Sequence, residues 1–90
     1  MSMTLDGDRL EAARHRLGLS VTDLWVRCLA LGSLLAPAEL TASLGGRRRF
    51  TRIEYDVVAQ ALNERFMDDG GDHPVPYADE AAEAAEAAGR

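Results

Sequence analysis

The chain of 90 residues has no lysine, one cysteine, one tryptophan and only three prolines. The single cysteine, Cys28, cannot form an intramolecular disulfide, and no charged start followed by an apolar run resembles a signal peptide. The longest apolar stretch, Cys28 to Ala38, is interrupted by glycine, serine and proline and is far too short to cross a bilayer. We therefore expect a cytoplasmic protein with no membrane contact.

Acidic residues outnumber basic ones, and the formal net charge is -5. Residues 70–90 hold five acidic side chains against Arg90, which places -4 in this tail and leaves -1 for the rest of the chain. The remainder is therefore nearly neutral and lacks the long-range attraction of a basic domain for nucleic acid. All ten basic residues are arginine, a bias that is typical of a GC-rich genome.

Four segments combine helix start and stop signals with apolar residues at helical spacing. They lie at about residues 8–17, 20–31, 37–44 and 51–67. The clearest start signal is the capping-box pair Thr51 and Glu54, and Ser20 is the predicted N-cap of the second segment. Because that second segment is apolar over most of its circumference, we expect it to be central and largely covered.

The expected fold is all-α, a small four-helix domain with an extended acidic C-terminal tail. Residues 1–7 are expected to be a flexible N-terminus, 8–69 the helical domain and 70–90 an extended or disordered tail. Val75 and Tyr77 are candidate anchors of this tail on the helices. On the fourth segment, the polar side chains of Asp56, Gln60, Asn63 and Glu64 are expected to face solvent. A domain this small is only marginally stable, which favours self-association.

The stretch LGLSVTDLWVRC, Leu17 to Cys28, partly resembles the turn and second helix of a helix-turn-helix. In that reading the residues entering the DNA groove are Val21, Thr22, Trp25 and Arg27. Base edges are read mainly by Arg, Lys, Asn and Gln, which this helix largely lacks, and Asp23 repels phosphate. The residues therefore favour a structural helix, with a DNA-binding helix-turn-helix regulator as the alternative.

The stretch GGRRRFTR gathers four arginines around one phenylalanine just before the fourth helical segment. Arginines beside an aromatic ring suit phosphates or a partner's carboxylates, and cations oppose the dipole at a helix N-terminus. The expected partner-binding residues are Arg47, Arg48, Arg49, Arg52 and Phe50, with Leu34 and Leu35 as an apolar patch between two helices. The alternative is a solvated loop with Phe50 in the core.

No set of residues with catalytic spacing is present. A nucleophile needs a positioned base, and neither of the two histidines lies near a serine or the cysteine in a recognisable motif. The acidic cluster Asp68, Asp69, Asp72 and His73 does not follow a calcium-loop pattern. We therefore expect no enzyme activity, no catalytic residues, no cofactor and no metal site.

The segments ALNERF (Ala61 to Phe66) and DHPVPY (Asp72 to Tyr77) resemble small, functionally uncharacterised helical proteins of actinobacteria. The resemblance implies a bacterial source and no particular activity or site. From the residues we expect a non-catalytic regulatory or protein-protein interaction module, whose partner is another protein or a second copy in a homodimer. Nucleic acid is the less favoured partner.

Overall fold

The computed structural model describes residues 4–88 and is all-α, as predicted. Its helices are α1 (Asp8–Leu17), α2 (Val21–Ala30), α3 (Pro37–Leu44), α4 (Arg52–Asp68) and α5 (Ala78–Ala88). Two short strands, β1 (Thr4–Leu5) and β2 (Phe50–Thr51), pair antiparallel with Leu5 opposite Phe50. None of the helices in residues 4–88 is long and apolar enough to cross a membrane.

The helix boundaries follow local signals in the sequence. Gly18 adopts a left-handed conformation, φ 64°, and ends α1, because a residue without a Cβ reaches this conformation at little cost. The Ser20 hydroxyl accepts a hydrogen bond from the Asp23 amide at 3.0 Å and so caps α2. Thr51 and Glu54 form the predicted capping box at the start of α4, with bonds of 2.9 and 3.2 Å.

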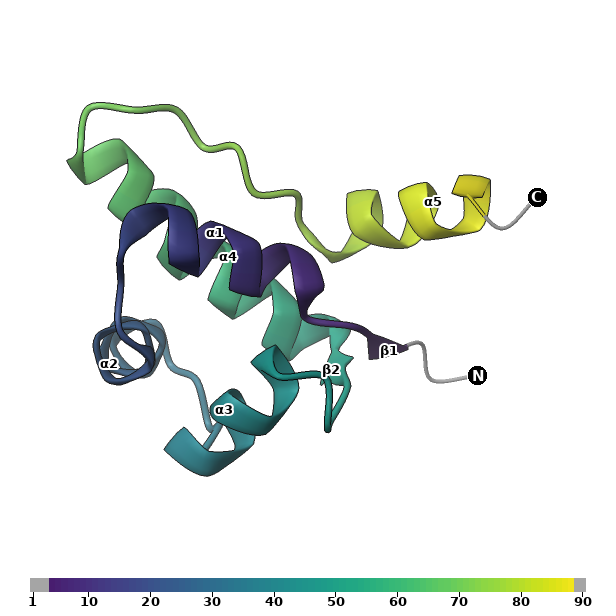
Figure 1. Ribbon diagram of the computed structural model, residues 1–90, viewed down its shortest axis with the longest axis horizontal. Helices are drawn as coiled ribbons and strands as arrows, with labels where there is room; N and C mark the ends of the chain where they lie inside the picture. Colours follow the sequence, from purple (N-terminus) through teal and green to yellow (C-terminus); the bar gives the residue numbers. More distant parts are fainter. Residues whose placement is uncertain (1–3, 89–90) are drawn as a thin grey trace.

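The longest helix, α4, is the centre of the fold. It contacts α1, α2 and α5, and Figure 1 shows α1 crossing in front of it. The buried face of α4 includes Tyr55, Val58 and Leu62, which are at most 1% exposed. These side chains pack with Leu10 of α1, Leu24 of α2 and Leu40 of α3 in one core.

Helix α2 lies at the edge of the molecule, so the expectation that it is central and largely covered is wrong (Figure 1). Leu24 and Cys28 are fully buried. Val26 and Leu29, on the opposite side of the helix, are 52% and 51% exposed. The segment is apolar over most of its circumference, but only one of its faces meets other elements of the described fold.

The segment after α4 differs from the predicted extended tail, because residues 78–88 form a fifth helix. Val75 is buried, as expected of an anchor, and the Ala78 amide donates to the Asp56 carboxylate at 2.7 Å. Ala78, Ala81 and Ala82 form one buried face, whose small side chains let α5 approach the domain closely. The segment is held by the burial of these alanines, by the buried Val75 side chain and by the hydrogen bond between Ala78 and Asp56. Composition alone does not reveal these contacts.

The described part of the N-terminal segment is paired with the rest of the fold. The N-terminus was expected to be flexible over residues 1–7, but Thr4 and Leu5 pair with β2, and Gly7 is buried at the start of α1. Residues 1–3 and 89–90 lie outside the described part of the chain, so the predictions for the first residues and for the extreme end of the tail are not addressed there.

Candidate functional site

The central arginine of the loop before α4 is bound to the protein itself. The Arg48 guanidinium donates to both carboxylate oxygens of Glu54, at 3.0 and 2.9 Å, and to the Ser43 hydroxyl at 3.0 Å. The hydrogen bond from Arg48 is the main cause that lowers the pKa of Glu54. Arg48 therefore holds the capping residue of α4 in place and is not a free cation, although its side chain is still 31% exposed.

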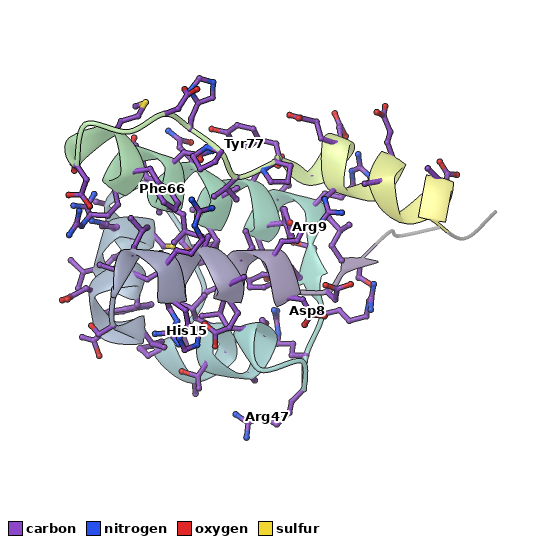
Figure 2. The ribbon with its side chains drawn as sticks, turned by 45° about the horizontal axis from the view of Figure 1, so that its top comes forward. Asp8, Arg9, His15, Arg47, Phe66 and Tyr77 are labelled. Carbon is purple, nitrogen blue, oxygen red and sulfur yellow. The ribbon has the colours of Figure 1, made fainter. Side chains whose placement is uncertain are left out.

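Two further arginines of this loop also have partners within the chain. Arg49 donates to the hydroxyl of Thr4 at 2.8 Å and to its carbonyl at 3.0 Å, which ties the loop to β1. Arg52 forms an ion pair with Asp79 at the start of α5. Arg47 is exposed and extends away from the fold (Figure 2). The cluster predicted from the sequence therefore divides into three arginines that have partners within the chain and one, Arg47, that extends into solvent.

Two apolar residues expected to contact a partner are in the core. Phe50 is 0% exposed and packs edge-on against the Tyr55 ring, with 6.0 Å between ring centroids. Leu35 is 5% exposed, and its carbonyl accepts a hydrogen bond from the Trp25 indole at 3.0 Å. Phe50 cannot reach a partner without unfolding, so the expectation is corrected for this residue. Leu35 does not project as expected, and it contributes only to the lining of the groove described below.

Leu34, by contrast, is 99% exposed. The hydroxyl of Ser33 accepts a hydrogen bond from the Leu35 amide at 3.1 Å and so shapes the turn between α2 and α3. Leu35 enters the core from this turn, and its neighbour Leu34 remains outside. The local backbone therefore holds a large aliphatic side chain in water.

A second exposed aliphatic side chain lies across a groove from Leu34. Ile53 is 80% exposed, because it falls out of phase with the buried positions Tyr55, Val58 and Leu62 of α4. Between the two side chains lies a groove of about 310 Å³. Its walls include Gly32, Ser33 and Leu34 on one side, and Thr51, Ile53 and Val57 on the other. We call this surface the Leu34–Ile53 groove.

Ile53 is not among the contact residues expected from the sequence. The available signal was its position, because an isoleucine two residues before Tyr55 is displaced by about 200° from the buried face of a helix. Fully burying one such side chain is worth about 1.5–3 kcal/mol. Two large aliphatic side chains beside a hollow are therefore the features expected of a contact surface.

The candidate DNA-binding residues do not form a basic, outward-facing surface on α2. Val21 and Trp25 are half-buried and pack against the core. Arg27 donates to the Asp68 carboxylate at 3.1 Å. Thr22 is exposed, on a face that it shares with Val26 and Leu29. This face offers few donors to base edges.

The remaining reactive groups lie apart from the groove. Burial raises the pKa of the Cys28 thiol to about 11, so at neutral pH the thiol is protonated as well as covered. In the acidic cluster, Asp68 and Asp69 pair with Arg27 and Arg65. Across residues 4–88, no three acidic, histidine or cysteine side chains are placed to hold a metal ion.

Comparisons of the chain with protein-family models, with curated proteins and with solved structures find no match. The functional proposal therefore depends on the surface itself.

Proposed function

We propose that the protein is a non-catalytic regulatory or interaction module of a bacterium, which binds a protein surface through the Leu34–Ile53 groove. The single observation that supports this proposal is the near-complete exposure of Leu34 and Ile53, 99% and 80%, on either side of a hollow. Isolated exposed aliphatic residues are common on protein surfaces, but two beside a groove are typical of a contact site.

The charges around the groove also favour a protein partner. Glu39 and Glu54 line it, and Arg48 is paired with Glu54 and lies 3.8 Å from Glu39. The rim is therefore mixed in sign, with an apolar centre, as in many protein-protein interfaces. Arg47, on the same loop as Arg48, supplies a charged contact that is not committed to the core (Figure 2).

DNA binding receives less support. A helix that reads the major groove needs outward-facing donors, and α2 presents Thr22, Val26 and Leu29. A phosphate-binding loop needs free cations, and Arg48 and Arg49 are engaged by Glu54 and Thr4.

The proposal is tested by site-specific photo-crosslinking in the cells that produce the protein. A photoreactive amino acid replaces Leu34 in the test variant and Met67 in a matched control. Met67 is also exposed, at 52%, but it lies at the C-terminal end of α4, whereas Ile53 of the groove lies at the N-terminal end. We expect a defined protein adduct from position 34, identified by mass spectrometry and reconstituted from purified components, and none from position 67. Absence of any adduct at position 34 contradicts the proposal.

A further inference from the structure

We infer that the occupant of the Leu34–Ile53 groove is a second copy of this chain, in a two-fold dimer where Leu34 of each copy enters the groove of the other. This inference rests on the proposed function and names the partner of the same surface. Two identical chains can form this contact, because one patch supplies both the projecting side chain and the hollow.

The shape of the patch is the first argument. A two-fold interface brings the same surface of both subunits together, so the surface must be complementary to itself. Leu34, 99% exposed, projects from one wall of the groove, and the hollow of about 310 Å³ lies directly beside it. Rotation by 180° therefore places the projection of one copy over the hollow of the other, and the converse contact follows from the symmetry.

The charges are the second argument. Glu39 and Arg48 lie side by side at the rim, 3.8 Å apart, and their side chains are 48% and 31% exposed. A two-fold axis between them lets Arg48 of one copy face Glu39 of the other, and the reciprocal pair forms at the same time. Glu54, which also lines the groove, is paired with Arg48, and Leu35 and Val57 carry no charge, so no ionic group has to be buried unpaired.

The distribution of exposed apolar side chains is the third argument. Within the described chain, six large apolar side chains are notably exposed, and four of them belong to α2, the loop after it and the start of α4. These four are Val26, Leu29, Leu34 and Ile53. A standard interface covers about 800 Å² on each partner, roughly one seventh of the 5424 Å² accessible surface of this chain. A small domain gains a larger buried core by such an association.

The test is sedimentation equilibrium of the full chain over a wide concentration range, with three variants. Leu34→Glu and Ile53→Glu place a charge in the groove, and Met67→Glu places the same charge on an exposed apolar residue at the far end of α4. Because all three side chains are more than half exposed, the variants should fold, which circular dichroism checks. We expect concentration-dependent dimerisation of the wild type and of Met67→Glu, and a dissociation constant at least about 30-fold higher for both groove variants.

A second measurement locates the contact. On dilution of the ¹⁵N-labelled wild type, amide shifts at Gly32, Ser33, Thr51 and Val57 should change most. A wild type that is monomeric at all concentrations, a Leu34→Glu variant that dimerises as well as the wild type, or shift changes confined to another surface each overturn the inference. A monomeric wild type whose position 34 still cross-links to a different protein in cells rejects the dimer and retains the proposed function.

Discussion

Asn63 and Val75 form two hydrogen bonds with each other, although they lie twelve positions apart in the chain. The Asn63 side-chain amide donates to the Val75 carbonyl at 2.9 Å, and its carbonyl oxygen accepts from the Val75 amide, also at 2.9 Å. Both residues are buried, at 3% and 5% exposure. An asparagine that the sequence analysis assigned to the solvent side therefore substitutes for a strand partner and fixes the segment between α4 and α5.

Replacing this asparagine should release the segment. Asn63→Leu leaves the amide and carbonyl of Val75 buried without partners, which costs about 1–3 kcal/mol of unfolding free energy. Urea denaturation measures the loss, and hydrogen exchange should show reduced protection of the Val75 amide. The matched control is Gln60→Leu, one turn earlier on α4 and exposed. Unchanged protection of Val75 in Asn63→Leu contradicts the prediction.

Stability should depend on pH through Glu54, whose pKa in the folded protein is lowered by Arg48 and by the Thr51 amide. A lowered pKa means that the stabilisation is complete above the unfolded-state value of 4.5 and is lost as the pH falls through the folded value. Glu54→Gln should cost about 1 kcal/mol at neutral pH, because a cap and a partly exposed ion pair are weakened.

The measurement is thermal or urea unfolding of the wild type and Glu54→Gln at pH 7 and at several values below 4.5. The difference in unfolding free energy between the wild type and Glu54→Gln should decrease steadily as the pH falls below 4.5. Glu64→Gln on the same helix is the control and should show a smaller effect at neutral pH. If the loss of unfolding free energy in Glu54→Gln does not change with pH, the charged pair is not its source.

Gly7 is required for close packing, whereas Gly18 is required for its backbone conformation. A Cβ on Gly7 would lie 2.5 Å from the Ser43 carbonyl oxygen and 2.8 Å from the Phe50 ring. Gly18 has φ +64° and open space around it. We expect Gly7→Ala to destabilise by about 1–3 kcal/mol through overpacking, and Gly18→Ala by about 1 kcal/mol through strain. Chemical denaturation ranks the two variants, and the reverse order is inconsistent with the close approach at Gly7.

Duplex DNA should bind weakly and without sequence preference. Fluorescence anisotropy with a labelled 30-base-pair duplex, at several salt concentrations, should give no saturable binding near physiological ionic strength. Arg47→Ala should leave this result unchanged. Tight binding whose salt dependence flattens in Arg47→Ala would instead support the helix-turn-helix alternative and the groove-facing role of Val21, Thr22, Trp25 and Arg27.

Local signals were sufficient for most of the helix boundaries. Ser20 caps α2, Thr51 and Glu54 cap α4, and Gly18 ends α1. These interactions join residues at most three or four positions apart, so the chain can form them in any global arrangement. The all-α class follows from the same signals and from apolar residues at helical spacing.

The candidate site required the tertiary structure. The apolar character of α2 predicted that the helix is covered on most sides. Burial of a helix face depends, however, on which other elements the fold packs against it. In the described chain no element covers Val26 and Leu29, which are about half exposed. The arginines of the loop looked free because their partners Thr4 and Asp79 are 45 and 27 residues away along the chain. Likewise, Ala-rich α5 docks because Asp56 accepts a hydrogen bond from its first residue, Ala78, and Asn63 holds the segment before it.

The sequence alone therefore determined where most of the helices begin and end, since capping and helical periodicity act within a few residues. Only the tertiary structure decided which side chains are buried in the core and which are exposed on the surface. That division depends on contacts between distant segments, and it assigns Phe50 and Leu35 to the core and leaves Leu34 and Ile53 in water.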